Sequence, residues 1–153
     1  MNVLAIDPGG VTGIAFYQDG IYTGEEVPNG FDGMAHALST AFSPLLPLDA
    51  VVIESFTINA GTHKKDPGMF ADTTAIIGAV RYVASVYGIP VKMQTPAKAK
   101  AFATDDKLRR LGWYDSTPGG HRNDAARHLL TFLASERDYR ILAALTPSGA
   151  PDA

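Results

Sequence analysis

Two short, uninterrupted apolar runs constrain the fold of this chain most strongly. Residues 3–6 and residues 50–53 carry only aliphatic side chains, and each run is followed at once by a carboxylate, Asp7 and Glu54. A strand that is apolar at every position is buried on both faces, which is typical of a sheet that helices cover on both sides. The sequence therefore predicts an α/β protein with an acidic side chain at the carboxyl end of each of two buried strands.

The rest of the pattern predicts an ordinary alternation of strands and helices. The Asp-Gly pair at residues 19–20 is a hairpin signal. Further strands are predicted at residues 11–17, 21–27 and 91–94, helices at 33–42, 72–87, 96–111 and 123–134 with an extension over 137–145, and a mobile loop at 56–68. This order predicts a central mixed five-stranded sheet flanked by helices, in one domain over residues 1–145 with a flexible tail at 146–153.

The helix predicted at residues 72–87 is apolar around a wide arc. At 100° per residue its apolar positions spread over roughly 200°, whereas a one-sided core helix needs a stripe only somewhat over ~100° wide. The excess predicts a second apolar contact, either with another copy of the chain in a dimer or with a neighbouring helix of the same chain.

Composition excludes several classes of protein. A chain of 153 residues fits one domain, and the absence of cysteine excludes disulfides, thiolate zinc sites and cysteine nucleophiles. No apolar stretch is expected to reach the ~18 residues that a membrane span needs, and the first residues lack the basic region of a signal peptide. We therefore expect a cytoplasmic protein that does not contact a membrane.

Charge is distributed unevenly along the chain. The formal net charge is −3, which argues against a simple basic protein that coats nucleic acid. Residues 92–127, however, hold eight basic and four acidic side chains, so this segment carries +4 and the remainder about −7. Two bound divalent cations would add four positive charges to an acidic cluster. The acidic total thus weakens the case for DNA binding without removing it.

The two strand-end carboxylates predict a metal site. If the two apolar strands are parallel neighbours at the usual ~4.8 Å spacing, Asp7 and Glu54 lie together at the edge of the sheet where α/β proteins bind ligands. Two ionised carboxylates at this distance repel each other unless a cation offsets their charge. Because the ligands are hard oxygens, that cation would be Mg²⁺ or Mn²⁺.

The last predicted helix adds candidate ligands. His121 and Asp124 are three residues apart, hence on one helical face, and His128 follows one turn later. Asp124 is a candidate third acidic ligand, and His121 is either a ligand or a group that acts on the attacking water or the leaving group. Simpler explanations exist for each residue: a turn for Asp7, a solvated strand end for Glu54, helix-start residues for His121 and Asp124, and a packed or surface position for His128.

Four segments occur in order along residues 3–134. They are an Asp-Pro-Gly followed by Thr-Gly within residues 5–15, Val-Ile-Glu-Ser-Phe at 52–56, Thr-Pro-x-x-x-Lys at 95–100 and His-x-x-Asp-Ala-Ala at 121–126. As a set they resemble the motifs of RuvC-type Holliday junction resolvases. The chain departs from the bacterial pattern in the loop after Glu54 and in a histidine where a fourth acid can stand. Its modest length resembles phage-encoded members more than cellular ones, which would place it in the host cytoplasm.

The resemblance implies an RNase H-like fold, a homodimer and two Mg²⁺ or Mn²⁺ ions per active site. By position, the catalytic and metal-binding residues would be Asp7, Glu54, His121 and Asp124. Lys107 would contact DNA near the scissile phosphate, and Phe56 would be the wedge that unstacks bases at the junction centre. The residues expected to contact DNA are Phe56, Lys64, Lys65, Lys98, Lys100, Lys107, Arg109, Arg110 and Arg122. Each lysine alone fits a solvated surface charge equally well.

The resemblance implies a metal-dependent endonuclease that resolves four-way DNA junctions by paired phosphodiester hydrolysis. A related nuclease of broader action on branched, flap or hybrid substrates has the same motifs, because fold and metal site do not fix the substrate. A non-catalytic junction-binding protein is a further alternative, although clustered carboxylates are costly without a metal. An actin- or sugar-kinase-like ATPase would need two lobes, which 153 residues do not supply.

Overall fold

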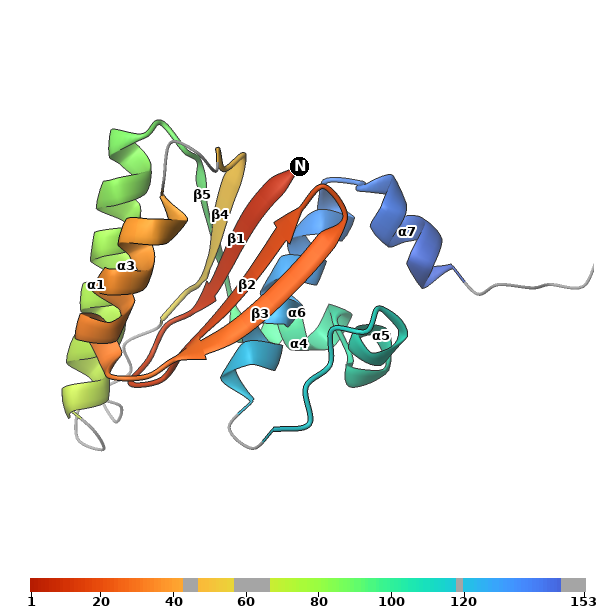
Figure 1. Cartoon of the computed structure of the whole chain (residues 1–153). Coiled ribbons are helices and arrows are strands. Elements are labelled where there is room, and N and C mark those ends of the chain that lie inside the picture. Colours follow the sequence, from red (N-terminus) through yellow and green to blue (C-terminus); the bar gives the residue numbers. More distant parts are fainter. Residues whose placement is uncertain (43–46, 57–66, 118–119, 147–153) are drawn as a thin grey trace, which may run out of the picture.

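The computed structural model describes residues 1–42, 47–56, 67–117 and 120–146. It contains a five-stranded sheet with the strand order β3-β2-β1-β4-β5 (Figure 1). The strands are β1 (Asn2–Asp7), β2 (Thr12–Gln18), β3 (Ile21–Val27), β4 (Ala50–Glu54) and β5 (Val91–Gln94). The mixed five-stranded sheet predicted from the sequence is confirmed.

Strand β1 joins an antiparallel half of the sheet to a parallel half. It pairs antiparallel with β2 and parallel with β4, and β4 pairs parallel with β5. Ile6 lies opposite Ile53, and Glu54 lies opposite Gln94. The carboxyl ends of β1, β4 and β5 therefore meet at one edge of the sheet, and the predicted parallel pairing of the two apolar strands is confirmed.

Helices cover both faces of the sheet. The helices are α1 (Gly30–Ala41), α3 (Pro67–Val86), α4 (Pro96–Phe102), α5 (Asp105–Arg110), α6 (His121–Ser135) and α7 (Tyr139–Leu145). Helices α1 and α3 lie on one face, and α6 lies on the other with α4 and α5 beside it (Figure 1). Leu4 and Ile6 of β1 are buried in the core under α1 and α3, whereas Val3 and Ala5 are buried in the core under α6. A stretch of strand with both faces buried is apolar at every position, as residues 3–6 of β1 are.

The single helix predicted over residues 96–111 is wrong, because the structure has two short helices there. Thr104 interrupts the stretch and caps α5, since its side chain accepts a hydrogen bond from the backbone N–H of Lys107. The predicted extension of the last helix is likewise a separate helix, α7. Arg137 adopts a positive φ of 58°, and Asp138 then caps α7 by accepting from the N–H groups of Arg140 and Ile141.

Other predicted boundaries differ from those in the structure by a few residues. Helix α1 begins at Gly30 rather than at residue 33, and α6 begins at His121 rather than at residue 123. The loop predicted at residues 56–68 is wrong at its end, because Pro67 and Gly68 already belong to α3. Residues 57–66 of that loop and residues 147–153 of the predicted tail lie outside the described residues.

Helix α3 is both long and strongly apolar. It is the one helix among the described residues that is long and apolar enough, by length and composition alone, to cross a membrane. Ile76, Val80 and Ala84 are nevertheless fully buried in the core, as in the core helix of an α/β domain. Tyr82 and Val86 on its outer side are 72% and 64% exposed. Packing against α1 thus accounts for part of the wide apolar arc.

Candidate active site

The first acidic side chain stands where β1 ends. Asp7 is only 8% exposed. Behind it the hydroxyl of Thr12 closes the Asp-Pro-Gly turn by accepting from the N–H of Gly9 at 3.3 Å and donating to the carbonyl of Gly9 at 3.1 Å. Thr12 is fully buried. The residues of this motif therefore serve both proposed purposes, since they make a turn and also place a carboxylate at the sheet edge.

The amino-terminal turn of α6 lies directly against β2. Gly120, which precedes the helix, has a φ of 75°, and Gly13 of β2 faces the backbone of His121 so closely that a Cβ at position 13 would collide with the His121 carbonyl. This close approach brings the Nδ1 atom of His121 to 3.1 Å from Oδ2 of Asp7. The contribution of Gly13 was missed, although its place in the Thr-Gly pattern was a signal.

The environment of Asp7 disfavours its ionised form. Burial raises the pKa of Asp7 from 3.8 to about 6, and the charges of Glu54 and Asp124 add to the rise, while the hydrogen bond and the charge of His121 oppose it. Carboxylates from two strands and one helix thus act on one another electrostatically. Asp7, Glu54, His121 and Asp124, which were predicted from three separate segments, are brought together.

Glu54 is held from the α6 side by a buried histidine. The Nε2 atom of His128 lies 2.9 Å from Oε2 of Glu54, and its Nδ1 atom lies 3.2 Å from Oε1 of Gln94. His128 is 1% exposed and Gln94 is 6% exposed. The packed position considered for His128 is therefore correct, and the packing is polar. Gln94 was missed, although a polar residue ending a third strand at the same edge was a usable signal.

Asp124 faces two cations. Its Oδ1 atom accepts from the Arg127 guanidinium at 2.6 Å, and its Oδ2 atom lies 3.3 Å from Nζ of Lys100. The same guanidinium also binds Asp105 at the start of α5. These residues, together with Thr104, line an open pocket of about 470 Å³ between α4, α5 and α6. Lys100 is thus placed beside Asp124, and its contact with DNA stays a prediction.

The carboxylates gathered here are suited to a divalent cation, although Asp124 is paired with the side chains of Arg127 and Lys100 in this structure. Among the described residues no three His, Asp or Glu side chains are arranged to hold a metal ion. In this arrangement one oxygen of Glu54 is bound to His128, and Asp124 is bound to Arg127 and Lys100. The chemistry of the set nevertheless suits Mg²⁺ or Mn²⁺, because carboxylate oxygens converge and raise the pKa of buried Asp7. Asp7, Glu54 and Asp124 could hold such an ion, with His121 beside them.

Most of the other predicted DNA-binding cations have partners within the chain. The Nζ atom of Lys107 donates to the Phe102 carbonyl at 2.7 Å and stands 3.9 Å from the centre of the Phe102 ring. Arg110 donates to the carbonyl of Leu145 at 2.9 Å. The remaining two arginines pair with aspartates: Arg109 with Asp106 at 3.1 Å, and Arg122 with Asp115 at 2.8 Å. Lys98 is exposed on α4.

The predicted wedge stands at the margin of the site. Phe56 follows β4 by two residues and is half-buried, with its ring centre 5.7 Å from that of Phe70 in α3. Lys64 and Lys65, which were expected to contact DNA, lie outside the described residues.

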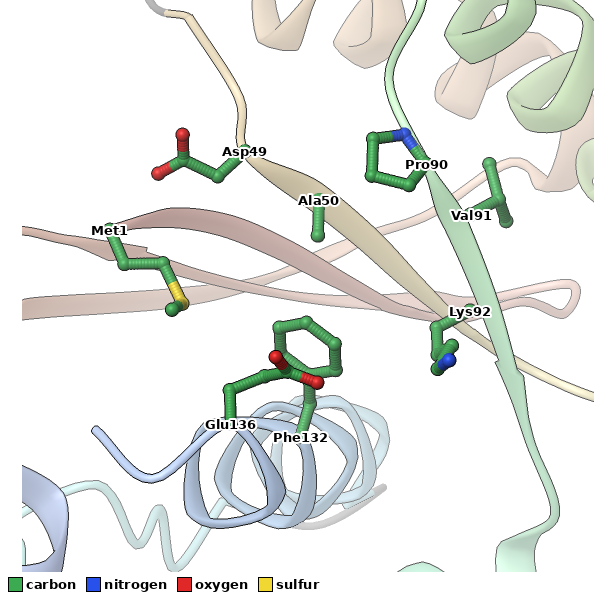
Figure 2. Close-up of a pocket in the computed structure, with 8 residues that line it drawn as sticks. All are labelled: Met1, Asp49, Ala50, Pro90, Val91, Lys92, Phe132 and Glu136. Atoms are coloured by element: carbon green, nitrogen blue, oxygen red, sulfur yellow. The ribbon is translucent and has the colours of Figure 1, made fainter.

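A cavity at the opposite end of the sheet is a poor alternative site. It encloses about 230 Å³ where β1, β4 and β5 begin and α6 ends (Figure 2). Its lining is largely apolar, with Asp49, Lys92 and Glu136 as the charged side chains. Figure 2 shows these three side chains spread around the opening rather than directed at one point. We therefore place the candidate site at the carboxyl ends of β1 and β4.

Comparison with known proteins bears on the fold. No family model matches the chain, and no curated protein sequence matches it. Among solved structures, Thermus thermophilus RuvC in complex with a Holliday junction substrate is similar with a TM-score of 0.65 and 21% identity, over 89% of this chain and 96% of that one. Another structure of Thermus thermophilus RuvC is similar over the same shares, with a TM-score of 0.62 and 21% identity. The fold is that of RuvC. The RNase H-like fold implied by the sequence motifs is therefore confirmed, since the five-stranded mixed sheet and its flanking helices match those of RuvC.

Proposed function

We propose that this protein is a metal-dependent endonuclease that cuts four-way DNA junctions by paired phosphodiester hydrolysis. The observation that carries the proposal is the convergence of Asp7, Glu54, His121 and Asp124 at one edge of a sheet with the RuvC fold. One of the similar RuvC structures holds a Holliday junction substrate. The fold alone does not fix the substrate, so the acidic site and its neighbouring cations supply the chemical part of the argument.

Asp7, Glu54 and Asp124 would hold the metal ions. Two Mg²⁺ or Mn²⁺ ions, when bound, offset the charge that develops on the attacking and leaving oxygens of the phosphodiester. The chain's own contribution is to fix the carboxylates on rigid elements, two at strand ends and one on α6. Asp124 has to exchange its bond to Arg127 for this purpose. The binding of a phosphate by Arg127 and Lys100 would favour that exchange, because these cations then have another anion to pair with.

His121 is suited to moving a proton or to binding metal. Its Nδ1 atom meets Asp7 at 3.1 Å, and its side chain is 42% exposed, so the other ring nitrogen is accessible to water. In this arrangement Asp7 orients the imidazole, as a carboxylate commonly does for a catalytic histidine. We assign His121 to the water or the leaving group of the reaction, with metal binding as the alternative role.

We further propose that the active form is a dimer that joins two copies through α3. Only 22% of the apolar 18-residue window of α3 is buried within one chain. Tyr82 and Val86 expose 72% and 64% of their surface on the side of α3 that faces away from the core. In such a dimer two active sites would be related by twofold symmetry, which would match the paired nicks of a four-way junction. Size-exclusion chromatography with light scattering tests this point, and a monomer at micromolar concentration would remove the dimer from the proposal.

Cleavage of a synthetic four-way junction tests the function. The assay compares the junction with matched duplex and flap DNA in Mg²⁺, Mn²⁺ and EDTA, using the wild type and Asp7→Asn. Asp32→Asn is the matched control, because Asp32 is an exposed carboxylate on α1, which lies on the opposite face of the sheet from α6. We expect paired, metal-dependent nicks on the junction that Asp7→Asn abolishes and Asp32→Asn retains.

The other outcomes discriminate between the alternatives. Equal or faster cutting of flaps would make the protein a nuclease of broader action on branched DNA. Tight junction binding without cutting in any metal would identify a non-catalytic junction-binding protein. Loss of both binding and cutting in Asp7→Asn would point to misfolding, which circular dichroism detects.

A further inference from the structure

A buried polar chain connects one candidate metal ligand to the interior. It runs from Glu54 through His128 to Gln94, with contacts of 2.9 Å and 3.2 Å. His128 is 1% exposed, so its imidazole has no access to solvent from which to draw other partners. The burial of His128 and its contact with a strand-end carboxylate therefore indicate a role in addition to packing in the core.

The direction of the hydrogen bonds follows from the chemistry of the groups. An ionised carboxylate only accepts, so the Nε2 atom of His128 carries a proton and donates to Glu54. The amide of Gln94 can meet Nδ1 as acceptor or, after rotation of its end group, as donor. Gln94 thus fixes the plane of the imidazole whichever protonation state it adopts, and the imidazole in turn fixes one oxygen of Glu54.

The elements that carry these residues make the arrangement rigid. Glu54 and Gln94 lie opposite each other in the parallel pair of β4 and β5. His128 lies on α6, one turn beyond Asp124 and two turns beyond His121. The helix that supplies the candidate site with Asp124 and His121 therefore also sets the orientation of Glu54.

We propose that His128, held by Gln94, is a positioning residue that orients the Glu54 carboxylate for metal binding. The inference rests on the proposed metal-dependent function. Outer residues that hydrogen-bond a metal-binding side chain typically account for about 10- to 100-fold in metal affinity. His128 raises metal affinity by removing rotational freedom from Glu54, without touching the metal or the DNA.

Mn²⁺ titration of the full chain without DNA tests the proposal, with affinity read from calorimetry or from the electron paramagnetic resonance of free Mn²⁺. His128→Leu removes the donor and is expected to weaken Mn²⁺ binding by about 10- to 100-fold. His128→Gln keeps an N–H donor on a side chain of similar reach and is expected to recover most of the affinity. Gln94→Leu releases the imidazole and is expected to have a smaller effect of the same sign.

Thr131→Val is the matched control, because Thr131 is also buried on α6 and its hydroxyl has no hydrogen-bond partner among the described residues. It is expected to leave Mn²⁺ affinity unchanged. A double variant adds a readout that general damage to the fold would not reproduce. In the Glu54→Gln background, His128→Leu should weaken Mn²⁺ binding no further, since the two residues act as one unit.

The outcomes separate this inference from the proposed function. Wild-type Mn²⁺ affinity in a folded His128→Leu variant, or equal losses in the Leu and Gln variants, would overturn the positioning role while junction cleavage by the wild type still upheld the function. If His128→Leu does not unfold cooperatively, Gln94→Leu decides, and unchanged affinity in that variant counts against the proposal. A wild type that neither binds Mn²⁺ nor cuts would overturn the function and this inference together.

Discussion

The substitution Asp7→Asn should make the metal-free protein more stable while removing its proposed activity. In the folded chain the pKa of Asp7 is raised from 3.8 to about 6, chiefly by burial and then by Glu54. Each pKa unit corresponds to about 1.36 kcal/mol, so ionised Asp7 destabilises the fold by about 3 kcal/mol. An asparagine removes the charge and keeps an oxygen that can accept a hydrogen bond from His121.

The raised pKa of Asp7 determines how the stability difference between the two proteins changes with pH. Because the folded pKa is the higher one, Asp7 costs nothing below pH 3.8, where it is protonated in both states. The cost grows as the pH rises toward 6 and is complete above that value. Asp7→Asn should therefore stabilise the protein by about 3 kcal/mol near pH 8, a melting temperature about 6–12 °C higher for a chain of this size. Near pH 4 the two proteins should differ little.

Urea unfolding in EDTA measures this difference through the single tryptophan, Trp113, which is buried and stacked on Tyr22 with ring centres 4.5 Å apart. Asp32→Asn, which removes an exposed charge, should change stability by less than about 0.5 kcal/mol. Added Mn²⁺ at about 100 times its dissociation constant should stabilise the wild type by about 2.7 kcal/mol and Asp7→Asn by much less. A gain that persisted at pH 4, or no gain at pH 8, would refute the electrostatic reasoning.

Three further predictions follow from other contacts. Arg127→Gln should tighten Mn²⁺ binding in the absence of DNA by about tenfold, opposite in sign to His128→Leu, because Asp124 loses a competing cation; the same titration measures it, and weaker binding would contradict it. Gly13→Ala should cost about 1–3 kcal/mol in urea unfolding and slow cleavage, because the new methyl group displaces the start of α6. Tyr22→Leu should change the fluorescence of Trp113 and cost about 1 kcal/mol for the lost ring stack; an unchanged spectrum would exclude the contact.

The framework of the fold could be predicted because a strand that is buried on both faces has an uninterrupted apolar sequence. Residues 3–6 and 50–53 had to be strands of a doubly covered sheet, and both are, with Asp7 and Glu54 ending β1 and β4 at the same edge. The breaks between helices were missed where the signal was one polar side chain. Thr104 and Asp138 cap α5 and α7, and each stands at a position that a search for N-cap residues would have marked.

The partners of the charged residues could not be predicted in the same way. Lys100 and Lys107 stand seven residues apart in one basic segment, yet Lys100 meets Asp124 and Lys107 turns to Phe102. That difference depends on how α4 and α5 pack beside α6, which no local pattern encodes. The bond from His128 to Glu54 likewise joins residues 74 positions apart and required the folded chain to be seen.

The acidic side chains of the candidate site repel one another, and each of them also has a hydrogen-bond or ion-pair partner of its own. Asp7 is met by His121 and Glu54 by His128, while Asp124 is met by Arg127 together with Lys100. The partners His121, Arg127 and His128 all project from α6, as does Asp124. One helix therefore completes the acidic cluster and also supplies most of the partners of the acids. Binding of a cation would make the offset of Asp124 by Arg127 unnecessary, which leaves that guanidinium available to a phosphate. Metal and DNA should accordingly strengthen each other's binding, because each removes a partner that the other would have to displace.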